Sequence, residues 1–165
     1  MDNQFFTSYG LKINLSDVVK EIVEFMNSKP NCFYKITIGS DSDVFEDKTA
    51  EFVTAIVIHR VGNGGRFFWK KEKKGKFFNL HDRIIQEVLL SVNTANSFIN
   101  ELKNTLNSQK IYNLKWDFEL HVDVVENGPT KSLIQEVVGI VRAHNFEAKT
   151  KPESYAASSV ADIFT

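Results

Sequence analysis

Four acidic residues stand at positions where they could gather around a cation. Asp41 follows one run of β-branched and aromatic residues, and Asp123 stands near the end of another. Glu87 and Asp162 lie in segments whose apolar or small residues have helical spacing. Neighbouring carboxylates repel each other unless they share a proton or a cation. Oxygen ligands that leave positions open to water and phosphate suit Mg²⁺ or Mn²⁺, and no Cys/His spacing indicates structural zinc.

Each of these acids also has a purely structural interpretation. Asp41 could cap a turn and Asp123 could close a strand. Glu87 could be a helix residue whose carboxylate reaches water, and Asp162 could lie in solvent. The case for a metal site therefore depends on whether the secondary structure brings the four together.

The strands are predicted from alternation of apolar and polar residues. Residues 32–38 form the first, and the strong turn Gly62-Asn63-Gly64-Gly65 separates a second from a third, so that these three make an antiparallel meander. Residues 114–125 alternate again and form the fourth strand, with Glu119, His121 and Asp123 on its less apolar face. The predicted second, third and fifth strands cover residues 51–60, 66–71 and 146–151.

The helices are predicted from apolar residues that recur every three or four positions. Ser16 or Asp17 can cap the first helix. Pro129 suits the first turn of the third, and Asn145 suits its end. The predicted helices cover residues 18–26, 80–106, 133–141 and 154–164.

This order of elements would bring the acids together. A strand that follows a helical crossover usually lies parallel to the strand before it, so the fourth strand can lie beside the first, with Asp41 next to Asp123. Glu87 falls on the edge of the apolar stripe of the long helix and should face inward. Asp162 lies in a helix rich in alanine and serine, which can approach the sheet closely.

Three motifs make the chain resemble the YkuK-like family of bacterial proteins, which are predicted to be ribonuclease H-like nucleases. They are Gly39-Ser40-Asp41-Ser42, His121-Val122-Asp123 followed by Asn127-Gly128-Pro129-Thr130-Lys131, and Ser154-Tyr155-Ala156-Ala157-Ser158-Ser159-Val160-Ala161-Asp162. The resemblance covers nearly all of the chain from about Leu15. It implies an α/β, ribonuclease H-like fold with a five-stranded mixed sheet in the order 3-2-1-4-5, in which strand 2 is antiparallel. We expect one domain over residues 1–165, of which 1–30 form an N-terminal helical extension.

The resemblance also implies a site and an activity. Asp41, Glu87, Asp123 and Asp162 match the family's metal ligands, although Asp82 and Glu101 compete with Glu87 for its role, and Asp43 could be an additional ligand. Two Mg²⁺ or Mn²⁺ ions roughly 3.5–4 Å apart would activate water and stabilise the leaving oxygen of a phosphodiester. The implied enzyme is a phosphodiesterase that cleaves RNA or DNA.

Other residues could serve such an enzyme. His121 could shuttle a proton, or be an ordinary packed histidine. Lys131 could contact phosphate at a helix start, or simply lie in solvent. A basic stretch beside Trp69 could bind RNA, an RNA–DNA hybrid or structured DNA, although a solvated edge strand has the same composition. The lysines of this stretch are Lys70, Lys71, Lys73 and Lys74.

Two other functions remain open. The chain could be a catalytically silent ribonuclease H-like module that binds nucleic acid or protein, or it could act on nucleotides. The second alternative ranks last because no GxxxxGK[ST] loop is present. The formal net charge of −1 excludes a surface that is basic throughout.

The remaining expectations concern the whole chain. Its 165 residues and 42% hydrophobic content suit one globular domain with a real core. Cys32 is the single cysteine, so no internal disulfide is possible. No signal peptide and no apolar run of about 20 residues is present, which predicts a cytoplasmic protein without a membrane partner. No pattern indicates an oligomeric state.

Overall fold

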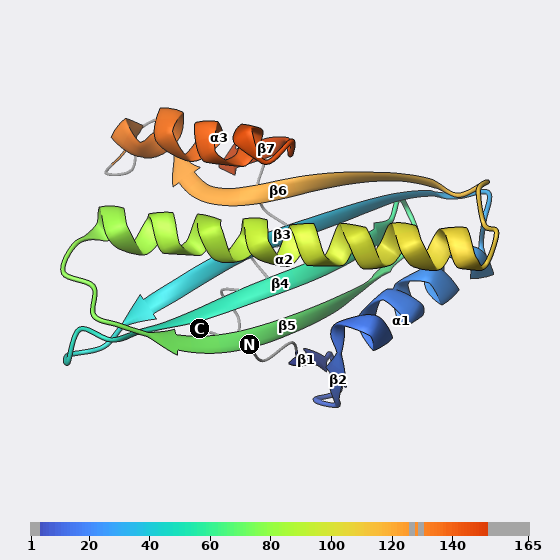
Figure 1. Cartoon of the computed structure of the whole chain (residues 1–165), viewed down its shortest axis with the longest axis horizontal. Helices are drawn as coiled ribbons and strands as arrows, with labels where there is room; N and C mark the ends of the chain where they lie inside the picture. The colour runs from blue at the N-terminus through green and yellow to red at the C-terminus, as the bar shows by residue number, and fades with distance from the viewer. Residues whose placement is uncertain (1–3, 126–127, 129–130, 152–165) are drawn as a thin grey trace.

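The computed structural model describes residues 4–125, 128 and 131–151. Its strands build a mixed sheet, and its helices pack against that sheet (Figure 1). The elements are β1 (Gln4–Thr7), β2 (Lys12–Asn14), α1 (Leu15–Ser28), β3 (Phe33–Val44), β4 (Ala50–Arg60), β5 (Gly65–Lys74), α2 (Leu80–Ser108), β6 (Lys115–Val125), a 3₁₀ turn (Lys131–Leu133), α3 (Ile134–Ala143) and β7 (Ala148–Lys151).

The sheet has seven strands in the order β2-β1-β5-β4-β3-β6-β7. The prediction of five strands in the order 3-2-1-4-5 is therefore wrong for the sheet as a whole. The two additional strands are the hairpin β1–β2, which pairs with the edge of β5. Within the sheet, β4 is antiparallel to both of its neighbours, whereas β6 is parallel to β3 and to β7.

Two phenylalanines hold the N-terminal hairpin in place. Phe5 is 1% exposed and belongs to the main core, while Phe6 stacks on Trp69 with ring centroids 4.7 Å apart. Gly10 has a φ of 82° in the turn, a conformation that glycine adopts without strain. Strands of four and three residues are too short to show alternation, which explains why the sequence pattern did not predict them.

Strand β3 runs through the motif that was expected to follow it. It pairs with β4 from Tyr34↔Arg60 to Val44↔Ala50, so Asp41 lies inside the strand rather than after its end. Tyr34, Ile36 and Ile38 are fully buried on the face that the helices cover. Regular alternation therefore continues into the polar segment, and Asp41 points to the opposite face from its serine neighbours.

Helix α1 is capped by Asn14 rather than by Ser16 or Asp17. The Asn14 side chain accepts a hydrogen bond from the Asp17 backbone N–H (2.8 Å), and the Asp17 carboxylate accepts one from the Asn14 N–H (3.4 Å). This reciprocal capping box satisfies donors that a helix start leaves unpaired. The cap therefore lies upstream of the expected position.

The main core lies between the sheet and the helices. Buried apolar residues of α1, α2 and α3 share one cluster with Ile36, Ile38, Leu120 and Val122 of the two central strands. Asn145, which was predicted to end the third helix, lies just after the last residue of α3. It has a φ of 65°, and the Phe146 N–H bonds the Val141 carbonyl oxygen, which ends the helix. The helix expected over residues 154–164 lies outside the described residues.

None of the described helices is long and apolar enough to cross a membrane.

Candidate metal centre

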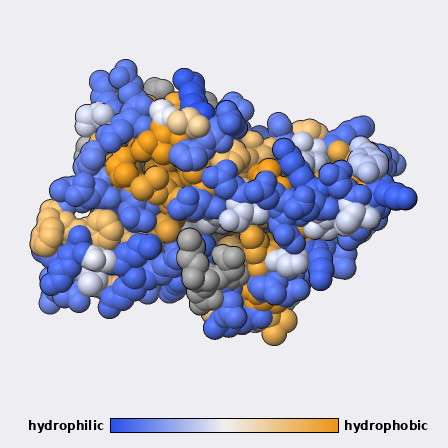
Figure 2. Space-filling model, in the orientation of Figure 1, coloured by the Kyte–Doolittle hydropathy of each residue, from blue (hydrophilic) through white to orange (hydrophobic). Residues whose placement is uncertain are grey.

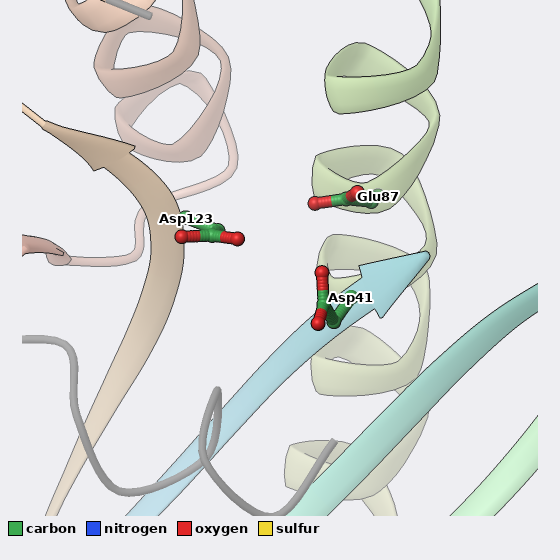
Figure 3. Close-up of side chains that lie close together, drawn as sticks. All are labelled: Asp41, Glu87 and Asp123. Atoms are coloured by element: carbon green, nitrogen blue, oxygen red, sulfur yellow. The ribbon is translucent and has the colours of Figure 1, made fainter. Parts of the chain in front are cut away.

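Three of the four predicted acids lie together. Asp41 of β3, Glu87 of α2 and Asp123 of β6 each contribute one carboxylate oxygen to a group in which these atoms all lie within 4.8 Å of one another. Figure 3 shows the three side chains directed toward a common space between the two strands and the helix. Asp41 and Asp123 are half-buried, and Glu87 is buried.

The parallel pairing of β3 and β6 places the two aspartates. The last paired residues are Gly39 and His121, and Asp41 and Asp123 each lie two positions further along their strands. Beyond this point β3 continues to pair with β4, while β6 pairs with β7 at Val125. Because side chains alternate along a strand, both carboxylates share one face where the two strands cease to be paired.

Serine hydroxyls join the site to α2. Ser40 and Ser42 point to the helix side of β3, opposite to Asp41. The Ser42 Oγ donates a hydrogen bond of 2.5 Å to Oε2 of Glu87, and its backbone N–H donates to Oδ1 of Asp41. Ser40 bonds Thr54 of β4 (2.9 Å) and Ser91 of α2 (2.7 Å). The Gly39–Ser42 motif therefore supplies one carboxylate and also fixes the helix that supplies another.

Glu87 is the most buried of the three carboxylates. Burial is the largest cause that raises the pKa of Glu87 from 4.5 to about 8, and the negative charges of Asp41 and Asp123 act in the same direction. The hydrogen bond from Ser42 and the positive charge of Arg83 act in the opposite direction. A cation between the three carboxylates would offset both the burial of the Glu87 charge and the repulsion from the two aspartates, and so favour loss of this proton.

The donor set fits a hard divalent cation. All three groups are carboxylates, and no His or Cys of the described residues joins them. Opposite ligands of a six-coordinate Mg²⁺ lie about 4.2 Å apart, twice the usual Mg–O distance, so small side-chain movements would bring all three oxygens into one shell. Three protein ligands also leave positions for water or phosphate.

The structure does not bring every predicted acid to this site. Asp43 is exposed and lies outside the group, although it shares the strand face of Asp41. Asp82 lies at the exposed start of α2, where its backbone N–H bonds the Asn79 cap, and Glu101 is likewise absent from the group. Asp162 lies outside the described residues. Glu87 is therefore the α2 acid that the fold places beside the aspartates.

His121 is buried near the site but belongs to a different set of charges. Its Nε2 lies 3.9 Å from Oε1 of Glu119, which also pairs with Lys35 and Lys149. Burial is the largest cause that lowers the pKa of His121, and it outweighs the opposing charge of Glu119. The imidazole is therefore neutral at neutral pH.

The predicted basic residues do not form one surface. Alternation along β5 places Lys70 and Lys74 on the face toward α2 and places Lys71 and Lys73 on the opposite face. Lys70 is 9% exposed and lies over the Phe5 ring, while Lys71 pairs with Glu51 at 3.3 Å. Lys131 is exposed in the 3₁₀ turn before α3.

Two residues beside the carboxylates were not predicted. Ser42 contacts Glu87 across a sequence separation of 45, and Arg83 acts on Glu87 through its charge. Arg83 could have been found, because it stands one helical turn before Glu87 and shares its helix face. Ser42 could not, because nothing in the sequence says which hydroxyl of β3 meets which residue of α2.

Comparisons with known proteins show the family of the chain. The sequence model of the family described as ribonuclease H-like matches residues 17–165. The chain is also similar to the uncharacterized protein YkuK of Bacillus subtilis (strain 168). The two are 31% identical over 166 residues, which cover 98% of this chain and 96% of YkuK. No solved structure matches the chain significantly. The matches extend over nearly the whole length, and they show that the chain belongs to the ribonuclease H-like family.

Proposed function

We propose that the protein is a metal-dependent nuclease that hydrolyses phosphodiester bonds in RNA or DNA. The observation that carries the proposal is the convergence of Asp41, Glu87 and Asp123 from three different elements within 4.8 Å. The buried carboxylate of Glu87 beside two other carboxylates is stable only when a proton or a cation lies among them. Membership of the ribonuclease H-like family supports the same activity.

The three carboxylates would hold Mg²⁺ or Mn²⁺, with Asp162 as a fourth ligand. When bound, a pair of such ions supplies Lewis-acid activation of water and neutralises charge on the phosphate. Asp41 and Asp123 approach from neighbouring strands, which fixes the distance between them. Ser42 orients Glu87 and favours its charged form, because it donates its hydroxyl hydrogen to the carboxylate.

Cleavage assays with matched variants test the proposal. Labelled single-stranded RNA, RNA–DNA hybrid, single-stranded DNA and branched DNA are incubated with the purified protein in Mg²⁺ or Mn²⁺. We expect Asp41→Asn and Asp123→Asn to lower the cleavage rate at least about a hundredfold. Asp117→Asn is the control, since Asp117 lies on β6 with the same side-chain parity as Asp123 but is exposed and outside the group.

Two outcomes separate the alternatives. Cleavage that survives both aspartate substitutions would come from a contaminant and would contradict the proposal. Salt-sensitive binding of nucleic acid without cleavage in either metal would instead favour a catalytically silent module.

A His121→Gln variant in the same assay tests the predicted proton shuttle, which requires slower cleavage with unchanged metal affinity.

A further inference from the structure

An exposed aromatic rim borders the carboxylate site at the end of β3. A cavity of about 190 Å³ is lined there by Val44, Lys48, Phe77, Phe78, Asn79, Leu80 and Arg83. Phe78 is 75% exposed, and Val44, Leu80 and the neighbouring Phe45 are each about two-fifths exposed. Figure 2 shows hydrophobic surface at the left edge of the view, where Figure 1 shows the loop between β5 and α2. Grouped exposed apolar side chains of this kind mark binding surfaces.

Contacts with the sheet hold the rim in place. The Phe77 backbone N–H bonds the Lys48 carbonyl oxygen (2.8 Å), and the Phe77 ring packs edge-on against Phe52 with centroids 5.3 Å apart. The Phe45 N–H bonds the Thr49 carbonyl oxygen (2.8 Å) on the other side. The neighbour of Phe78 is thus anchored in the core, which presents the Phe78 ring to solvent without a large loss of order on binding.

The rim and the carboxylates share two elements. Val44 lies three residues after Asp41 on β3, and Arg83 lies one helical turn before Glu87 on α2. The positive charge of Arg83 lowers the pKa of Glu87. The cavity is therefore separated from the carboxylates by only three residues along β3 and one turn along α2. A short ligand can contact both.

The charges of the cavity suit phosphate. Lys48 and Arg83 both line it, and the Nζ of Lys73 lies 5.1 Å from the centre of the ring of Phe45, which follows Val44 in the chain. Asp47 is exposed nearby, but its carboxylate accepts hydrogen bonds from both the backbone N–H and the hydroxyl of Thr49. The Asp47 carboxylate is therefore hydrogen-bonded within its own turn.

We propose that the aromatic rim receives an unpaired nucleotide of single-stranded RNA or DNA. The base stacks on Phe78, and the adjoining phosphates contact Lys48 and Arg83, so that the next phosphate reaches the carboxylates. An unpaired base offers a free face to an aromatic ring, whereas bases inside a duplex already stack on each other. This inference rests on the proposed nuclease function and names its substrate class.

Fluorescence anisotropy with a short labelled single strand and the blunt duplex of the same sequence tests the proposal. The titration contains EDTA, and gels verify that the oligonucleotide stays intact. Phe78→Ala should weaken single-strand binding at least about fivefold and leave duplex binding unchanged. Tyr112→Ala is the matched control, because Tyr112 is 74% exposed but lies beyond the opposite end of α2. Lys48→Gln should reduce the slope of log affinity against log salt by about 0.7.

Several results would overturn the rim as a nucleotide site. They are equal single-strand affinity of Phe78→Ala and the unaltered protein, preference for the duplex, or no binding of either nucleic acid. Circular dichroism verifies that the variants are folded. Single-strand cleavage that Phe78→Ala does not affect would reject the rim and leave the nuclease proposal intact. Selective single-strand binding that depends on Phe78, without cleavage in any metal, would reject the nuclease proposal and leave the rim as a nucleotide site.

Discussion

Ser42 and Glu87 are joined by a hydrogen bond of 2.5 Å that links the end of β3 to α2 inside the carboxylate group. The bond favours the charged form of Glu87 and opposes the effect of burial. Through it, one residue of the Gly39–Ser42 motif controls an acid that stands 45 positions away.

Removal of this hydroxyl should weaken metal binding. In Ser42→Ala the pKa of Glu87 rises further, so a smaller fraction of the carboxylate is ionised at neutral pH. We expect Mn²⁺ affinity measured by calorimetry to fall about tenfold, as is typical for groups that orient a metal ligand. Ser91→Ala is the comparison, since Ser91 bonds Ser40 rather than a carboxylate; it should cost about 1 kcal/mol of stability and leave affinity unchanged. Unaltered affinity in Ser42→Ala would refute this role.

The pH dependence of stability should identify Glu87. Its pKa is raised from 4.5 to about 8 in the folded protein. The native state therefore holds a proton that the unfolded chain releases, and the associated stability is fully present below about pH 4.5 and is lost as the pH rises through about 8. Urea denaturation in EDTA should show stability that decreases from about pH 5 to about pH 8 and levels off at higher pH.

Two variants of that measurement make it specific. Glu87→Gln should flatten the decrease, because the amide does not titrate. Added Mg²⁺ should restore stability mainly at high pH, where the carboxylate is charged and can bind the ion. A decrease of the same size in Glu87→Gln would assign the pH dependence to another group.

Arg60 should be essential for the packing of α1 on the sheet. Its buried guanidinium donates to the Phe25 carbonyl oxygen (2.7 Å), to the Ser28 Oγ (2.9 Å) and to the Tyr34 hydroxyl (3.0 Å), close to the end of the helix. Arg60→Met removes three hydrogen bonds from this buried cluster, and we expect a loss of about 2–4 kcal/mol in urea denaturation. Arg66→Met should change stability by less than about 1 kcal/mol, since Arg66 is exposed, donates to the adjacent Gly65 carbonyl oxygen and otherwise lies over the Phe25 ring at 4.7 Å. Similar losses in the two variants would contradict this assignment.

The acids of the site were predictable because strand and helix periodicity act locally. Alternation places Asp41 and Asp123 each on the less apolar face of its own strand, and Glu87 follows from the apolar stripe of α2. The N-terminal hairpin was not predictable, because its strands are held by Phe5 and Phe6 through contacts with distant residues. The same holds for the end of α1, whose carbonyl groups find their partners on β3 and β4. Local patterns thus place side chains on faces, while long-range pairing decides which faces meet.

Alternation along β5 yields the last prediction. The four lysines read as one basic stretch, but Lys71 and Lys73 lie on the strand face of Asp41, and Lys70 and Lys74 lie on the face toward α2. The register aligns Lys71 with Val53 and Val53 with Asp41, so Lys71 is two strands, about 10 Å, from the site. A nucleic acid that crosses this face should meet Lys71 and Lys73 only. The double variant K71Q/K73Q should therefore weaken binding and reduce the salt slope by about 1.4, whereas K70Q/K74Q should leave the slope unchanged. Equal loss of slope in both double variants would mean that charge alone, and not the strand face that presents it, determines binding.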